Sequence, residues 1–178
     1  MFVHPTAEVE QGAVIGEGTK VWHICHIRRG ARIGQGCVLA RGVYVDTDVS
    51  IGDRVKIQNY VSVFHGVTVE DGVFLGPHVC FTNDLFPRAV NQDMSAKSAD
   101  DWVVAPTRVR AGASIGANAT IVCGIEIGRW AMIGAGTVVT KDVPDHALVV
   151  GNPGRIIGYV TAGGKRVASV EEARGDLR

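Results

Sequence analysis

A period of six residues runs through most of this 178-residue chain. Counting from Val3 in steps of six gives fourteen consecutive large apolar residues, the last of which is Phe81. A second run in a new phase starts at Val103 and ends at Val139. A helix would place apolar residues at i, i+3, i+4 and i+7, and an ordinary strand would alternate them. The period therefore excludes both as the main element.

The period predicts an all-β fold, a parallel β-helix. Each hexapeptide makes one short strand and a turn, and three hexapeptides complete one coil. The coils stack at the spacing of paired strands, about 4.8 Å. We expect about seven coils in one domain over residues 1–160, followed by residues 161–178 as a tail or short helix. The 23 glycines supply unusual backbone angles at turns.

Each repeat has an aliphatic residue, glycine or a similar residue, two variable residues, a small residue and one more. This order resembles the hexapeptide-repeat acyltransferases over roughly residues 3–160. The resemblance implies a left-handed β-helix and a homotrimer with sites between subunits. Large apolar groups at outward positions agree with a trimer, because a thin prism has no second layer to cover them. They are Trp22, Tyr44, Phe64, Phe74 and Trp130.

The repeat breaks after Phe81, where the phase indicates 16 extra residues in a loop at about residues 84–102. A long loop in a strict solenoid is usually functional, although a packing or trimer-clasping role is the alternative. Residues 18 apart share a column, so Asn83 should neighbour His65. We expect this column to continue into small residues along which a thin ligand can lie. These residues are Gly116, Ala117, Gly134 and Ala135. The alternative is that they are simply the preferred turn residues of the repeat.

Residues 55–89 carry a more specific likeness. The segments IQN, VSVFHGVTVED, GP, FTND and PR within them, with VTKDVPDHALVVGNP at 139–153, resemble the nucleotide-linked amino-sugar N-acetyltransferases. Those enzymes acetylate the 3-amino group of a dideoxy sugar on dTDP or of an amino uronic acid on UDP. The resemblance implies acetyl-CoA as cosubstrate, a nucleotide-linked amino sugar as acceptor, and a role in surface polysaccharide biosynthesis. The choice between dTDP and UDP stays open.

Transfer of an acetyl group from a thioester to an amine needs a deprotonated amine and a stabilised oxyanion. His65 departs from the resemblance, since relatives often carry Glu there. Histidine ordinarily titrates near pH ~6.5, so His65 is the candidate base. The leaving thiolate of coenzyme A is the alternative proton acceptor. We expect Asn83 to position the amine, Asp84 to orient the sugar or His65, and a backbone N–H near Gly76 or Gly116 to bind the oxyanion.

Four further residues are candidates for binding the acceptor. Arg88 can pair with a diphosphate or carboxylate as a fork donor, and Pro87 stands beside it. Tyr60 and His78 share a column, one coil apart, so they either contact the substrate or simply stack on each other.

The segment GNPGRI at 151–156 resembles the closing motif of the acyltransferase family. That region lies near the nucleotide end of coenzyme A in such enzymes. The resemblance implies that Lys141 and Arg155 meet its phosphates. A capping role without ligand contact is equally open for Arg155.

Composition argues against several other functions. The chain has 18 basic and 18 acidic residues, so it lacks the positive excess of a nucleic-acid-binding protein. It shows no secretion signal and no apolar run long enough for a membrane span, so we expect a soluble cytoplasmic protein. The four cysteines lack CxxC spacing and are expected to be reduced.

No metal is expected. His23 and His26 flank Cys25, which occupies an inward position of the repeat. The γ-type carbonic anhydrases share this fold and bind zinc through three histidines, two of them five apart, whereas no two histidines of this chain are five apart. Two other functions stay open: an acetyltransferase acting on a hydroxyl or another acceptor, and a non-catalytic scaffold that binds no acetyl-CoA.

Overall fold

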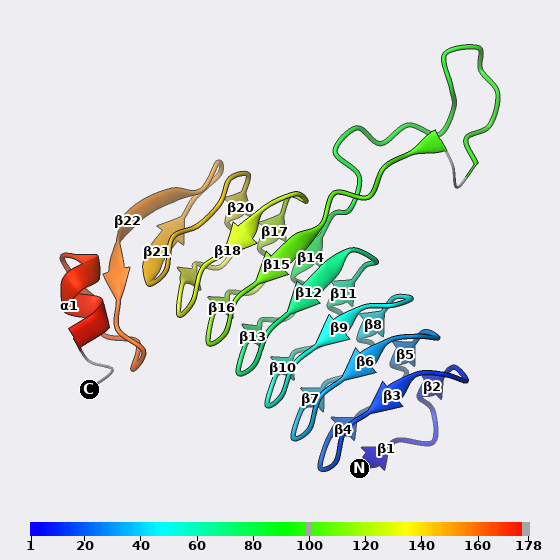
Figure 1. Cartoon of the computed structure of the whole chain (residues 1–178), viewed down its shortest axis with the longest axis horizontal. Helices are drawn as coiled ribbons and strands as arrows, with labels where there is room; N and C mark the ends of the chain where they lie inside the picture. The colour runs from blue at the N-terminus through cyan, green and yellow to red at the C-terminus, as the bar shows by residue number, and fades with distance from the viewer. Residues whose placement is uncertain (99–100, 176–178) are drawn as a thin grey trace.

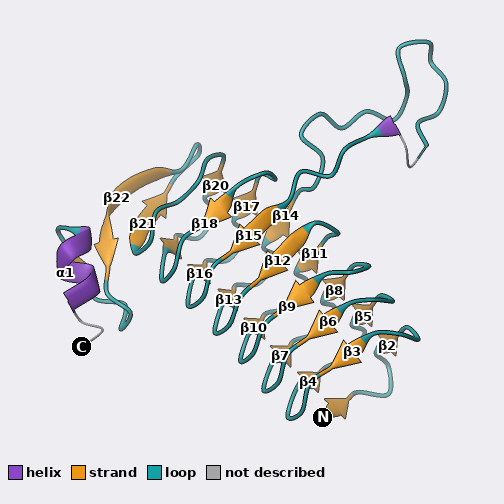
Figure 2. Cartoon of the chain, in the orientation of Figure 1, coloured by secondary structure: helices purple, strands orange, loops and turns teal. Residues whose placement is uncertain are grey.

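The computed structural model describes residues 1–98 and 101–175, in which the chain winds into a three-sided prism (Figure 1). Short strands joined by tight turns form one sheet on each side (Figure 2). Strands of successive coils pair in parallel at a spacing of three hexapeptides, as Lys20 with Val38 and Val38 with Lys56. The predicted parallel β-helix is confirmed.

The three sheets, named here A, B and C, take one strand each in turn along the chain. Sheet A contains β1 (Phe2–Val3), β4 (Lys20–Val21), β7 (Val38–Leu39), β10 (Lys56–Ile57), β13 (Phe74–Leu75), β16 (Ser114–Ile115), β19 (Met132–Ile133), β21 (Ala147–Val150), β22 (Arg155–Val160) and β23 (Arg166–Val167). Sheet B contains β2 (Glu8–Val9), β5 (His26–Ile27), β8 (Tyr44–Val45), β11 (Ser62–Val63), β14 (Cys80–Phe81), β17 (Thr120–Ile121) and β20 (Val138–Val139). Sheet C contains β3 (Val14–Ile15), β6 (Arg32–Ile33), β9 (Ser50–Ile51), β12 (Val67–Val69), β15 (Thr107–Val109) and β18 (Glu126–Ile127).

The large apolar residues of the period fill the inside of the prism. Ile57, Leu75 and Ile115 follow one another on sheet A, and none of them is exposed to solvent. Full burial of such a side chain stabilises the fold by about 1.5–3 kcal/mol. The small residues of the repeat, such as Ala113 and Ala119, are buried at the turns. The core is therefore one continuous column of aliphatic layers.

The long loop connects β14 to β15 and projects from the prism (Figure 1). Val69 pairs with Val109, whereas the predicted insertion would have paired it with Val103. The insertion is therefore one hexapeptide longer than predicted. The prediction was wrong because it counted Val103 as a repeat position, although this residue is 83% exposed and belongs to the segment that returns from the loop. Residues 99–100 of the predicted loop range lie outside the described residues.

The end of the chain closes the prism in a way that the sequence did not predict. Strand β22 turns back and pairs antiparallel with β21, and β23 pairs antiparallel with β22. The helix α1 (Val170–Gly175) packs against both β22 and β23 and buries Ala173. The division at residue 160 stays a prediction, and residues 176–178 lie outside the described part. No helix in the described residues has the length and hydropathy needed to cross a membrane.

Candidate active site

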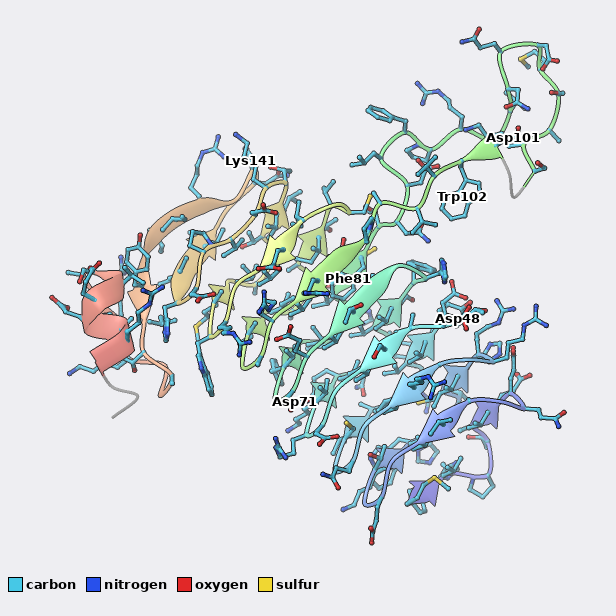
Figure 3. The ribbon with its side chains drawn as sticks, in the orientation of Figure 1. Asp48, Asp71, Phe81, Asp101, Trp102 and Lys141 are labelled. Carbon is cyan, nitrogen blue, oxygen red and sulfur yellow. The ribbon has the colours of Figure 1, made fainter. Side chains whose placement is uncertain are left out.

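The predicted site residues lie on two different edges of the prism. The BC edge is formed by the turns that lead from sheet B to sheet C, and the AB edge by those from sheet A to sheet B. Figure 3 marks the BC edge with Asp48 and Lys141, on the side from which the loop departs. The BC edge carries His65, Asn83 and Lys141, and the loop that leaves this edge carries Asp84, Pro87 and Arg88. Arg155 begins β22 and lines a hollow together with Lys141. On the AB edge lie Tyr60, His78, Gly116, Ala117, Gly134 and Ala135.

The strand pairing corrects the predicted column. Asn83 follows β14, and Phe81 of that strand pairs with Ile121, so the BC column continues to Cys123 and then to Lys141. Gly116 instead follows Ile115, which pairs with Leu75 on sheet A. The predicted continuation from Asn83 into Gly116, Ala117, Gly134 and Ala135 is therefore wrong within one chain. The period defines the spacing, but it does not say which side a strand joins after an insertion.

The backbone fixes the orientation of the His65 imidazole. Its Nδ1 lies 2.9 Å from the carbonyl oxygen of Thr47, one coil before it. Because a carbonyl only accepts, Nδ1 carries the hydrogen and donates it. In the neutral ring Nε2 is then the unprotonated nitrogen. The side chain is exposed on the BC edge, so Nε2 is a base that a ligand can reach.

Asp46 holds this arrangement in place. Its carboxylate accepts the N–H of His65 at 3.2 Å and that of Thr47 at 2.7 Å. The Tyr44 hydroxyl donates to it at 3.0 Å, and Arg28 lies 3.4 Å away. Burial alone would raise the pKa of Asp46, but these hydrogen bonds and the Arg28 charge together lower it. Asp46 was missed in the sequence, although Glu10, Arg28 and Asp46 stand one coil apart with alternating charge.

Asn83 lies next to His65, as predicted, and contacts its backbone. The Asn83 amide nitrogen donates to the His65 carbonyl oxygen at 3.4 Å, which leaves the side-chain oxygen as an acceptor for an amine N–H. Asp84 accepts the N–H of Phe86 at 2.8 Å and so shapes the start of the loop. Within the described residues no hydrogen bond joins Asp84 to His65.

The two ends of the loop are fastened beside His65. Ala105 donates its N–H to the Asn83 carbonyl at 3.1 Å, and Thr107 donates to the Gly66 carbonyl at 3.0 Å. Gly66 has a φ of 90°, and a Cβ there would overlap the Val104 side chain. Only glycine fits this position without displacing the returning segment. The loop is thus held at a fixed place on the BC edge.

Two hollows lie along this edge. The first, about 460 Å³, is lined by Lys141, Arg155 and the apolar side chains of Val139, Val149 and Ile156. The second, also about 460 Å³, lies at the base of the loop and is lined by Asn83, Asp84, Arg88, Ala89, Lys97, Ser98 and Trp102. Three coils separate His65 from Lys141, roughly 14 Å along the axis. An extended ligand on this edge can therefore span from the cations to the base.

The AB edge presents a different surface. Tyr60 and His78 stack with their ring centroids 5.4 Å apart, and Arg41 donates to the Tyr60 hydroxyl at 2.9 Å. Gly116 is explained by packing, since a Cβ there would lie 2.6 Å from the backbone nitrogen of Ala135. These contacts account for the residue types without a ligand.

The oxyanion donor was predicted near Gly76 or Gly116, and the N–H groups of these two glycines themselves are already used. The N–H of Gly76 already donates to Ile115, and that of Gly116 to Ile133, both at 2.8 Å. Each of these amides is used in stacking one coil on the next. Within the described part of the chain, no acceptor is found for the N–H groups of Ala117 and Ala135. They are candidate donors on the AB edge, and Ala117 directly follows Gly116, so a donor near Gly116 stays a prediction.

Comparison with known proteins identifies the family. The model "Bacterial transferase hexapeptide (six repeats)" matches residues 12–47 and 106–141. A dTDP-3-amino-3,6-dideoxy-α-D-galactopyranose 3-N-acetyltransferase of Aneurinibacillus thermoaerophilus is 47% identical over 159 residues, which cover 89% of this chain and 78% of that protein. The chain is a hexapeptide-repeat acyltransferase.

Two further relatives of this acyltransferase differ in their acceptor. Serine acetyltransferase 4 of Arabidopsis thaliana is 37% identical over 75% of this chain but only 29% of its own length. A mutant GDP-perosamine N-acetyltransferase of Caulobacter crescentus, solved with coenzyme A and GDP-perosamine, is 25% identical with a TM-score of 0.55 and covers 88% of this chain and 55% of that one. The resemblance to this family and the left-handed β-helix that it implies are confirmed.

Metal ligands were not expected in this acyltransferase. His23 stacks on His4, with ring centroids 3.6 Å apart, and His26 contacts Glu10 at 3.0 Å. Cys25 is buried, as its place in the repeat predicted. Among residues 1–98 and 101–175 no group of three or more His, Cys, Asp or Glu side chains is arranged to hold a metal.

Proposed function

We propose that this acyltransferase moves the acetyl group of acetyl-CoA to the 3-amino group of a nucleotide-linked amino-deoxy sugar, in the biosynthesis of a surface polysaccharide. The relative of 47% identity is named for this reaction. The observation that carries the proposal is that His65, whose Nε2 is an exposed base, is followed in its column by Asn83, whose amide donates to the His65 carbonyl and which also lines the loop hollow. An amine bound at Asn83 would be one coil from the residue that can take its proton.

The ammonium nitrogen must lose two protons, one before it attacks and one as the amide forms. His65 Nε2 takes the first proton, and the free amine attacks the thioester carbonyl carbon. The C–N bond forms and the C–S bond breaks, the nitrogen gives its second proton to the leaving coenzyme A thiolate, and His65 releases the first proton to solvent. The N–H groups of Ala117 or Ala135 are suited to hold the intermediate oxyanion, because they have no other acceptor in the described residues.

Acetyl-CoA fits the BC edge. Lys141 and Arg155 are exposed cations in one hollow, and they meet phosphates well. From that hollow the edge leads past Cys123 to Asn83 and His65. The thioester of a molecule anchored by its phosphates at Lys141 would therefore reach the base.

A homotrimer would complete the site. The donors Ala117 and Ala135 and the Tyr60–His78 stack lie on the AB edge, and the base lies on the BC edge. Sheet B separates these edges in one chain. With sheet B turned toward a threefold axis, the AB edge of one subunit meets the BC edge of the next. Sites between subunits then explain why the predicted residues divide between two edges.

The first experiment measures the reaction directly. The purified protein is mixed with acetyl-CoA and with dTDP- and UDP-linked 3-amino sugars, and thiol release and product mass are followed. Release with formation of a base-stable amide supports the proposal. Acetylation of a hydroxyl instead, or acetyl-CoA binding without transfer, would assign another acceptor. Absence of acetyl-CoA binding would leave the scaffold function.

Mixed trimers test the shared site. We expect His65→Ala and Ala135→Trp each to be inactive alone, since one removes the base and the other blocks the opposite edge. After unfolding and refolding together in equal amounts, about one site in four combines two intact edges. Recovery of roughly a quarter of wild-type activity is therefore expected. Sedimentation verifies that each variant is trimeric, and failure to recover activity in mixed trimers would contradict the shared site.

Asp46→Asn tests the support of the base. The amide keeps the shape but loses the charge that Arg28 and two backbone N–H groups meet. We expect kcat to fall about tenfold with the KM for acetyl-CoA unchanged, because His65 loses its fixed position. Asp48→Asn, at an exposed turn one coil before His65, is the matched control. Equal kcat values for Asp46→Asn and Asp48→Asn would contradict a role of Asp46 in positioning the base.

We place the reaction in the cytoplasm, where acetyl-CoA and nucleotide sugars are made.

A further inference from the structure

The loop is a self-supported hairpin rather than a loose excursion. Val90 bridges Ala96, Asn91 donates its N–H to the Ser95 carbonyl at 2.9 Å, and Lys97 donates to the Ala89 carbonyl at 3.2 Å. Asp101 accepts the N–H of Ser98 at 2.7 Å. These bonds hold the two arms of the hairpin at a fixed separation above the BC edge.

This pairing brings two cations together. Because Lys97 lies opposite Ala89, it stands next to Arg88 across the hairpin, and both line the hollow at its base. Among the described residues neither makes an ion pair with a carboxylate. Hydrogen bonds from Ser98 and Asn91 lower the pKa of Asp101, and Lys97 adds only the smallest part. The two positive charges therefore line one hollow, which they share with the carboxylate of Asp84.

An aromatic ring completes the same hollow. Trp102 is half-buried and lines it together with Lys97, and no other described aromatic ring packs on its indole. Figure 3 shows that the indole extends from the returning segment of the loop toward the side on which Asp48 lies. Asn83 and Asp84 also line it. The hollow thus joins an amine position, two cations and an open aromatic face.

We propose that this hollow is the nucleotide subsite of the acceptor, with the base stacked on Trp102 and the diphosphate held between Arg88 and Lys97. The inference rests on the proposed function and adds two residues, Lys97 and Trp102, that the sequence did not single out. A sugar linked to that diphosphate points its amine toward Asn83 and His65. The indole accepts thymine and uracil alike, because stacking needs only a flat ring.

Nucleotide binding tests the subsite without acetyl transfer. The probes are dTDP and UDP, titrated calorimetrically into the purified protein. We expect Trp102→Ala to weaken binding about tenfold and Trp102→Phe to keep most of it. Lys97→Ala and Arg88→Ala should also weaken it, with a loss that shrinks as salt rises. Phe86→Ala is the matched control, since this side chain is 81% exposed on the same loop and does not line the hollow.

The outcomes separate this inference from the proposed function. If the wild type binds dTDP or UDP and acetylates an amino sugar, but Trp102→Ala and Lys97→Ala bind as tightly as Phe86→Ala, the subsite is wrong and the proposed function stands. If the wild type binds neither nucleotide and acetylates no nucleotide-linked sugar, both fail. Weakened nucleotide binding with an unchanged KM for acetyl-CoA supports the subsite.

Discussion

Replacing His65 by alanine will lower kcat for acetyl transfer by about 10²–10⁴-fold, the usual contribution of a positioned general base. The Nδ1–H bond to Thr47 leaves Nε2 as the acceptor, and alanine removes it. Acetyl-CoA binding should change less than twofold, because the cations that anchor it lie three coils away at Lys141. Steady-state kinetics and calorimetric titration with coenzyme A measure the two effects.

His23→Ala is the control for this prediction. His23 is also an exposed histidine, but it lies on the AB edge near the start of the prism and stacks on His4. Its loss should leave kcat unchanged. An unchanged kcat in His65→Ala itself would assign the proton to the coenzyme A thiolate and reduce His65 to a neighbour of Asn83.

The largest effect on stability is expected from Phe81→Ala. Phe81 is 1% exposed and forms a core layer with Ile121 directly below the loop. Removing the ring leaves a cavity that the stacked coils cannot close, at a cost of about 3–5 kcal/mol. In a domain of this size we expect the midpoint of thermal unfolding to fall by roughly 10 °C.

Phe86→Ala gives the comparison for that measurement. Phe86 is 81% exposed, so its loss should change stability by no more than about 0.5 kcal/mol. Thermal unfolding scans of Phe81→Ala and Phe86→Ala at equal protein concentration compare the same substitution at a buried and at an exposed position. Equal midpoints would mean that Phe81 does not carry the core layer below the loop.

The sequence predicted the fold because a strict period constrains every coil in the same way. It failed where the period is interrupted. The insertion between Val69 and its partner Val109 is not a whole number of hexapeptides, so the phase after it does not show where the prism resumes. Val103 lies six residues before Val109 and so matches the period of the second run, but its side chain is exposed to solvent. The next residues that point inward are Thr107 and Val109.

The site was predicted in part for a related reason. The spacing of one coil correctly placed Asn83 beside His65 and Tyr60 on His78. It could not assign columns to sides after the loop, so Gly116 was placed on the wrong edge. Backbone hydrogen bonds are also invisible in a pattern of side chains, so the sequence could not show which N–H near Gly76 or Gly116 is free.

The stacking of coils makes lengths on this enzyme discrete. Each coil adds about 4.8 Å along the axis and returns every side chain to its own edge. The gap between the phosphate-binding cations and the base can therefore change only by whole coils. A variant that gains or loses three complete hexapeptides between Asn83 and Lys141 keeps the same reacting groups, but the distance between the base and the phosphate-binding cations changes by one coil. Such a variant would fit a donor whose phosphates and thioester are separated by a different length.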